Sequence, residues 1–203
     1  AYTPGISEHF TKSFATEELR PGFREHWTRG RMIGGSTEIN GSVWNRGWKD
    51  DYDVMERVGI KGWNWQAFLG AYKRLEDHEF GASEIRGAGG PVPISRARPT
   101  DPTVEKFFEA ALSNGIPVVE DPNGSDVERV GYTMSNVKRG MRVGADAAFL
   151  RPARHRKNLT IISHADVDKV ILQDRRAVGV EAVTRTGRRS FEARKEVLLA
   201  AGA

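Results

Sequence analysis

The sequence predicts a mixed α/β fold with an α+β portion, and three observations support this prediction. Apolar residues recur at helical spacing over residues 65–75 and again over 102–112. After Asn158 they alternate instead in short runs separated by turn residues, as in strands. A last continuous apolar run, 197–200, is typical of a strand buried on both faces. We therefore expect helices in the first three quarters of the chain and strands in the last quarter.

The composition is that of a globular protein. The chain has 203 residues, 38% hydrophobic and 29% charged, with a net charge of +4, which excludes a disordered chain. It contains no Cys, so a disulfide framework, a thiolate metal site and a Cys nucleophile are excluded. No apolar run reaches the roughly 18 residues that a membrane span needs. These features predict a cytoplasmic protein with no membrane span.

The first half of the chain contains one weak and one clear helix signal. Residues 1–27 have no regular pattern, and we expect them to be irregular. Acidic residues favour a helix start at Asp50-Asp51, and Gly59 marks the end of that short helix. Asn64 then caps a longer helix whose apolar stripe includes Leu75. We expect this second helix to end in a charged run.

A third helix is predicted after a segment rich in Gly, Pro and Ser. Residues 81–100 have this composition and are expected to form a linker or domain crossing. Asp101 and Pro102 are typical of a helix start, with proline at the first helical position, and Asn114-Gly115 is typical of its end. The expected buried face of this helix consists of Val104, Phe107, Phe108, Ala111 and Leu112.

The remainder is predicted to consist of short elements followed by strands. Residues 120–128 are expected to form a polar loop, 129–138 a strand and 144–154 a short helix. Beyond them we expect an antiparallel meander and one strand that joins a larger sheet. The expected strands are 159–162, 167–172, 178–182, 190–193 and 197–200.

The densest motif lies between Gly30 and Gly47. In Gly34-Gly35-Ser36 the glycines allow backbone N–H groups to approach a polar ligand without interference from Cβ. Asn40-Gly41-Ser42 adds an amide, bare backbone and a hydroxyl. Such a cluster suits a large, flat, polar cofactor. The residues alone are equally compatible with a glycine-rich turn that leads into a helix cap.

The same stretch resembles the first signature of the glucose–methanol–choline (GMC) flavin oxidoreductases. The family pattern is Gly-Arg-x-aliphatic-Gly-Gly-Ser-Ser/Thr-x-aliphatic-Asn, followed by an aromatic residue, Arg-Gly and an acidic residue. The resemblance continues through Phe149-Leu150-Arg151-Pro152 and the tail 196–203, and covers roughly residues 16–203. The matching residues of the signature are Gly30, Arg31, Ile33, Gly34, Gly35, Ser36, Thr37, Ile39, Asn40, Trp44, Arg46, Gly47 and Asp53.

The resemblance implies a GMC-type FAD-binding domain, Rossmann-like and incomplete here, that is interrupted by a substrate-binding domain. Residues 1–80 and 158–203 would belong to the FAD domain, and 81–157 to the substrate domain. Backbone groups of Val167 would hold the adenine, and Ala201-Gly202 would lie at the adenine–ribose end. The FAD-binding residues implied in this way are Gly34, Gly35, Ser36, Asn40, Gly41, Ser42, Val43, Val167, Ala201 and Gly202.

The implied activity is oxidation of a small-molecule alcohol at its CH–OH group by hydride transfer to FAD. Some relatives attach FAD covalently through a His beside the Asn, and here that place is occupied by Ile39, which implies non-covalent FAD. The family's GxGxxG and its active-site His have no counterpart in this sequence. We therefore expect an internal fragment, inactive alone, whose main partner is the rest of its own polypeptide and which holds none of the catalytic residues.

Two alternatives come from other functional classes. The first alternative is a GMC relative that uses FAD structurally, as in a lyase. The second is a basic binding module without enzymatic activity. Residues 138–157 hold seven basic residues and one acid, but aromatic residues are not interleaved, so we expect a solvated face rather than a nucleic-acid surface. The five His lack the i, i+4 spacing of a metal motif, and no metal site is expected.

Overall fold

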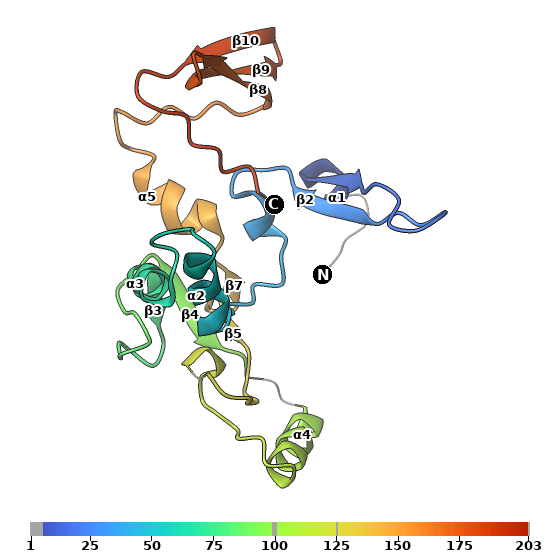
Figure 1. Ribbon diagram of the computed structural model, residues 1–203, viewed down its shortest axis with the longest axis vertical. Helices are drawn as coiled ribbons and strands as arrows, with labels where there is room; N and C mark the ends of the chain where they lie inside the picture. Colours follow the sequence, from blue (N-terminus) through green and yellow to red (C-terminus); the bar gives the residue numbers. More distant parts are fainter. Residues whose placement is uncertain (1–5, 99–100, 125, 203) are drawn as a thin grey trace. The chain divides into compact units, whose positions relative to one another are not determined.

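The computed structural model describes residues 6–98, 101–124 and 126–202, and the chain divides into two compact units between Pro152 and Ala153 (Figure 1). Each unit combines helices or turns with small sheets, which agrees with the mixed α/β prediction. Within the described ranges, no helix has the length and apolar character that crossing a bilayer requires.

The first unit begins with a helix and a hairpin. Helix α1 (Ile6–Phe10) leads into strand β1 (Thr11–Ala15), which pairs antiparallel with β2 (His26–Gly30). The expectation of an irregular segment over 1–27 is therefore wrong for the described part of it, and residues 1–5 lie outside the description. Both strands are largely exposed. Their sequences therefore need no alternation of apolar and polar residues, which is the pattern by which a half-buried strand is recognised.

The next helices follow their predicted capping signals. After the 3-10 turn η1 (Gly35–Glu38), helix α2 spans Lys49–Arg57 and helix α3 spans Trp65–Leu75. The side chain of Asn64 accepts a hydrogen bond from the N–H of Ala67 at 3.0 Å, which confirms the predicted cap. Helix α3 ends at Leu75, within the predicted charged run, and the following residues enter a sheet.

That sheet has three strands, with β4 (Val92–Arg96) in the middle. Strand β3 (Glu76–His78) pairs parallel to β4, and β5 (Met134–Ser135) pairs antiparallel to it. The predicted linker 81–100 therefore contains a central strand, and residues 99–100 lie outside the description. Proline at 91 and 93 concealed this strand, because proline is unusual in a central strand. The core is Val92, Ile94, Met134 and Ala148.

Helix α4 (Pro102–Ser113) begins as predicted but buries a narrower face. Asp101 accepts a hydrogen bond from the N–H of Thr103 at 2.9 Å, and Pro102 is the first helical residue. Phe108 is buried and its ring lies 4.9 Å from that of Tyr132. Phe107 and Leu112, expected on the buried face, are 59% and 58% exposed, since only one edge of the stripe is covered within the described residues.

Short elements complete this unit. They are the 3-10 turn η2 (Pro122–Gly124), the hairpin of β6 (Val137–Lys138) and β7 (Met141–Arg142), the π-helix η3 (Asp146–Leu150) and helix α5 (Arg151–Ala153). The predicted helix is confirmed by η3 and α5, and the predicted loop 120–128 contains the turn η2, with residue 125 outside the described residues. Strand structure within 129–138 is limited to β5 and β6.

The second unit is built on an antiparallel meander. Strands β8 (Ala165–Gln173), β9 (Arg176–Thr184) and β10 (Gly187–Glu192) form one sheet in the order β10-β9-β8 (Figure 1). The predicted turn at Asp174-Arg175 is confirmed, and both residues have positive φ, 47° and 66°, as in the turns that suit a two-residue hairpin.

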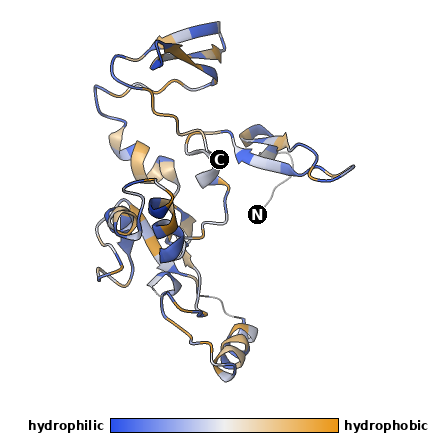
Figure 2. Cartoon of the chain, in the orientation of Figure 1, coloured by the Kyte–Doolittle hydropathy of each residue, from blue (hydrophilic) through white to orange (hydrophobic). Residues whose placement is uncertain are grey.

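Two predicted strands of this unit are wrong. Residues 159–162 and 197–200 are apolar (Figure 2) but have no strand structure, and Leu198 and Leu199 are 82% and 75% exposed. A continuous apolar run becomes a buried strand only where neighbouring strands pair with it. No described strand pairs with either segment.

Candidate functional site

The loop Gly34–Val43 has a backbone that requires glycine. Gly34 and Gly35 have φ of 93° and 55°, in the left-handed region that glycine adopts without strain. A Cβ at Gly35 would have no neighbouring atom within 4 Å, so this side of the loop is open. A Cβ at Gly30 would overlap the carbonyl of Gly35, and Ser36 Oγ accepts the Gly30 N–H at 3.1 Å. The loop therefore packs closely against Gly30 on one side, and its other side, at Gly35, is open.

Residues 142–145, distant in sequence but in the same unit, hold the loop by hydrogen bonds. Thr37 Oγ1 donates to the carbonyl of Gly34 at 2.5 Å and accepts the N–H of Ala145 at 2.8 Å. Asn40 Oδ1 accepts the N–H of Ser42 at 3.0 Å and a hydrogen bond from Arg142 Nη1 at 2.5 Å. Residues about one hundred positions apart thus meet at this loop, which local sequence patterns do not reveal.

The end of the loop joins the sheet of the first unit. The carbonyl of Ser42 accepts the N–H of Asn136 at 3.0 Å, and Val43 forms a bridge with Ser135. Ser42 is buried, with φ of 58°, whereas the neighbouring Val43 is 56% exposed. Of the seven predicted cofactor-binding residues of this loop, Gly34 and Gly35 are half-buried and Ser42 is buried, whereas Ser36, Asn40, Gly41 and Val43 are exposed.

A buried ion pair lies behind this loop. Arg46 and Glu76 are in direct contact, with side chains 2% and 0% exposed. Glu76 Oε1 also accepts the indole N–H of Trp44 at 2.8 Å, and Oε2 accepts the N–H of Gly87 at 3.0 Å. Trp44 and Arg46 are matched positions of the signature, but the sequence pattern did not predict their burial or that Glu76 is their partner.

Two tyrosines extend the network. The hydroxyls of Tyr52 and Tyr72 are 3.0 Å apart, and the Arg46 guanidinium lies 5.0 Å from the centre of the Tyr72 ring. Burial, followed by the hydrogen bond to Tyr52, raises the pKa of Tyr72. The raised pKa keeps the Tyr72 hydroxyl protonated at neutral pH, and the contact between the two hydroxyls links α2 to α3.

His78 is the enclosed histidine of the chain. Its Nδ1 accepts the N–H of Phe80 at 3.2 Å, and its Nε2 lies 3.4 Å from Asp121 Oδ2. Burial is the main cause that lowers the pKa of His78, against the opposing effect of Asp121. The other four histidines are exposed. Among the described residues, no three His, Asp or Glu side chains gather as a metal site would need.

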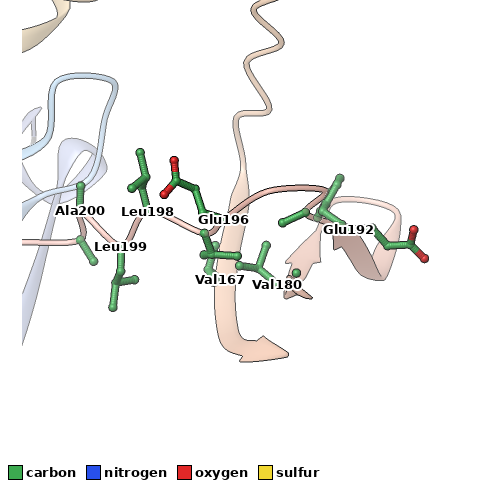
Figure 3. A pocket seen from close by; sticks show the side chains of 12 residues that line it. Val167, Val180, Glu192, Glu196, Leu198, Leu199 and Ala200 are labelled. Carbon is green, nitrogen blue, oxygen red and sulfur yellow. The ribbon is translucent and has the colours of Figure 1, made fainter. Parts of the chain in front are cut away.

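The remaining predicted residues lie in the second unit. Val167 of β8 and Ala201 both line one apolar groove of about 540 Å³, between the sheet and the segment that follows β10 (Figure 3). Val180 and Leu199 are also part of its lining. Gly202, next to Ala201, has φ of 92°. Because β8 is an edge strand, half of its backbone groups face away from β9.

A family model described as GMC oxidoreductase matches residues 21–203, nearly the whole chain. The chain belongs to the GMC oxidoreductase family. The resemblance carried by Gly30–Gly47 is thereby confirmed, as is the assignment of the fold class to this family's FAD-binding domain. The open glycine loop and the buried Arg46 are both parts of the matched region.

Individual GMC proteins agree with this assignment. The mitochondrial choline dehydrogenase of Homo sapiens is 38% identical over 178 residues, which is 88% of this chain and 30% of that protein. The crystal structure of pyridoxine 4-oxidase from Mesorbium loti superposes with a TM-score of 0.82 at 32% identity, covering 90% of this chain and 37% of that one. An FAD-dependent oxidoreductase from Chaetomium thermophilum gives 0.80 at 27% identity, covering 89% and 34%. This chain spans about a third of the length of these GMC relatives.

Proposed function

We propose that this chain forms part of the FAD site of a GMC oxidoreductase that oxidises a small-molecule alcohol at its CH–OH group. The observation that carries the proposal is the loop Gly34–Val43, where Gly35, with positive φ, leaves an open face inside the matched family region. The names of relatives support both the cofactor and the substrate class of this proposal. One relative is named as FAD-dependent, and others are named for choline or pyridoxine.

The residues present fit such a cofactor. The open side of Gly35 gives backbone N–H groups access to phosphate or ribityl oxygens, and exposed Asn40 and Val43 offer an amide and an apolar contact to a ring. In the second unit, the apolar groove at Val167 and Ala201 suits an adenine. The proposed contacts are Gly34, Gly35, Ser36, Asn40, Gly41, Ser42, Val43, Val167, Ala201 and Gly202.

We propose that the FAD is held non-covalently, because Ile39, the neighbour of Asn40, has no nucleophilic atom. When bound, FAD would supply the acceptor for the hydride of the alcohol's carbinol carbon. The role of this chain is to bind and orient the cofactor through the loop and the groove. A base that takes the hydroxyl proton would come from another part of a longer polypeptide, since the chain spans about a third of its relatives.

The domain division proposed for this chain is FAD domain over 1–80 and 158–203, with substrate domain over 81–157. The strand run after Asn158 and the change of composition at residue 81 support it. Since no Cys is present, a reducing compartment such as the cytoplasm is the proposed location.

The test uses the full-length protein that carries this chain. Its absorbance should show bound flavin, and a primary alcohol under anaerobic conditions should bleach that absorbance. A colourless protein would exclude the flavin site and favour a binding module. Bound flavin that no alcohol of a broad panel reduces would favour a structural use of FAD, as in a lyase.

A further inference from the structure

The amide orientation of Asn40 is fixed by its two partners. Its Oδ1 accepts from the N–H of Ser42 at 3.0 Å and from Nη1 of Arg142 at 2.5 Å. A backbone amide nitrogen and a guanidinium can only donate, so the atom that they share must be the oxygen. The amide nitrogen of Asn40, which donates two hydrogen bonds, is therefore on the opposite side of the group. At this exposed position the loop presents a donor.

Arg142 is itself held in place. It is the last residue of β7, in the hairpin where it pairs with Val137. Its Nη1 also donates to the carbonyl of Thr37 at 3.3 Å, and three residues further on the N–H of Ala145 donates to Thr37 Oγ1. One guanidinium thus contacts both ends of the segment Thr37–Asn40. Charge-assisted hydrogen bonds of this kind are stronger than neutral ones, so Arg142 dominates the orientation of Asn40.

We infer that Arg142 is a positioning residue of the flavin site, which holds Asn40 so that its amide nitrogen donates to an acceptor atom of the cofactor. This inference rests on the function proposed above. Without Arg142 only the Ser42 N–H holds the oxygen of Asn40, so the amide is held less firmly, and the reversed orientation, whose oxygen repels an acceptor, becomes more populated. Arg142 would then act on cofactor binding through Asn40 and not through its own contact.

The first experiment measures the dissociation constant of FAD for the full-length apoprotein by fluorescence quenching. Arg142→Met retains the aliphatic part of the side chain but removes the donors, and it should weaken FAD binding about tenfold. Arg142→Lys should recover part of this loss. Lys138→Met, on the paired strand of the same hairpin, removes the same charge at an exposed position and should leave the constant within about twofold of the wild type.

The second experiment separates positioning from support of the fold. Asn40→Asp keeps an acceptor for Arg142 and forms an ion pair with it, but it has no donor. This variant should retain the thermal midpoint of the apoprotein. It should weaken FAD binding as much as Asn40→Ala does. Addition of Arg142→Met to Asn40→Ala should cause no further loss, because the two residues act as a unit.

The outcomes distinguish the two proposals. A wild-type protein that binds no FAD overturns the proposed function itself. A wild-type protein that binds FAD, with Arg142→Met binding equally well, overturns the positioning role alone. Losses that add in the double variant, together with a lower thermal midpoint for Arg142→Met, would show that Arg142 only supports the fold.

Discussion

Arg46 and Glu76 form an ion pair in which the side chains are 2% and 0% exposed, and Glu76 also accepts hydrogen bonds from Trp44 and Gly87. Arg46 is part of the signature that identifies the family, and Glu76 begins the strand that follows α3. The pair therefore ties the segment just after the glycine loop to the sheet of the first unit. Its position indicates that part of the signature serves the fold behind the site.

The first prediction concerns the stability of this pair. Glu76→Gln leaves the Arg46 charge buried without a counter-charge, and it should lower the free energy of unfolding by about 3–5 kcal/mol. Lys106→Met removes one partner of the exposed pair with Glu109 and should cost less than about 0.5 kcal/mol. Urea denaturation measures both. Equal losses in the two variants would contradict the account of the buried pair.

The second prediction concerns pH and His78. Burial lowers the pKa of His78 in the folded state below the value of about 6.5 of the unfolded chain. The unfolded state therefore binds the proton first, and the folded state loses stability as pH falls below about 6.5, until the folded pKa is passed. Protonation also places a hydrogen on Nδ1, which then no longer accepts from Phe80.

His78→Asn tests this account, because its amide oxygen can accept from Phe80 without titrating. The stability of the wild type relative to this variant should fall between pH 7 and pH 5, measured by urea denaturation. His155→Asn, at an exposed position, is the control and should change little over that range. A His78→Asn difference that is constant with pH, or that grows in favour of the wild type in acid, would refute the prediction.

How far the sequence predicts this fold depends on whether the signals are local. Asn64 and Asp101 cap their helices as predicted, and the turn at Asp174-Arg175 lies where expected, because each feature depends on a few adjacent residues. The strands at 159–162 and 197–200 failed because a buried strand needs neighbours that local patterns do not specify. Similarly, two prolines concealed a central strand within 81–100.

The same distinction holds for the candidate site. The glycine loop was predictable, since positive φ and close backbone approach leave a direct trace in the sequence. The hydrogen bonds from Arg142 and Ala145 to the loop were not predictable, because they join residues more than one hundred positions apart. The burial of Glu76 and its pairing with Arg46 were not predicted for the same reason: a carboxylate that becomes fully buried has no distinctive sequence context.

The third prediction concerns attachment of the flavin. If FAD is held non-covalently, acid precipitation of the full-length protein should release the flavin into the supernatant, where its absorbance can be measured. Ile39 stands beside Asn40 and offers no atom for a covalent bond. Yellow colour that remains in the washed pellet would show that another residue attaches the cofactor.

The fourth prediction is negative. The 203-residue chain, expressed alone, should bind FAD weakly or not at all and should oxidise no primary alcohol with a dye acceptor. Leu198 and Leu199 are highly exposed, so poor solubility is also expected. Micromolar FAD affinity combined with turnover above a free-flavin blank would show that the chain is self-sufficient.

A suitable control for the glycine loop must match its backbone strain. Gly87 does not, because a Cβ there would lie 2.8 Å from the Cα of Lys73 and would damage the fold. Gly62 does: its φ is 81°, and no atom lies within 4 Å of the position that a Cβ would take, as at Gly35. At either position valine therefore meets similar conformational strain, and its Cβ has no neighbouring atom within 4 Å.

The most direct measurement is the flavin content of the full-length protein with Gly35→Val compared with Gly62→Val, taken as the ratio of flavin to protein absorbance after purification. If the open face of Gly34–Val43 receives FAD, the Gly35 variant should lose most of its flavin and the Gly62 variant should retain nearly all of it, with similar thermal midpoints for the two apoproteins. Equal flavin occupancy in the two variants would contradict the account and would reduce the loop to a turn.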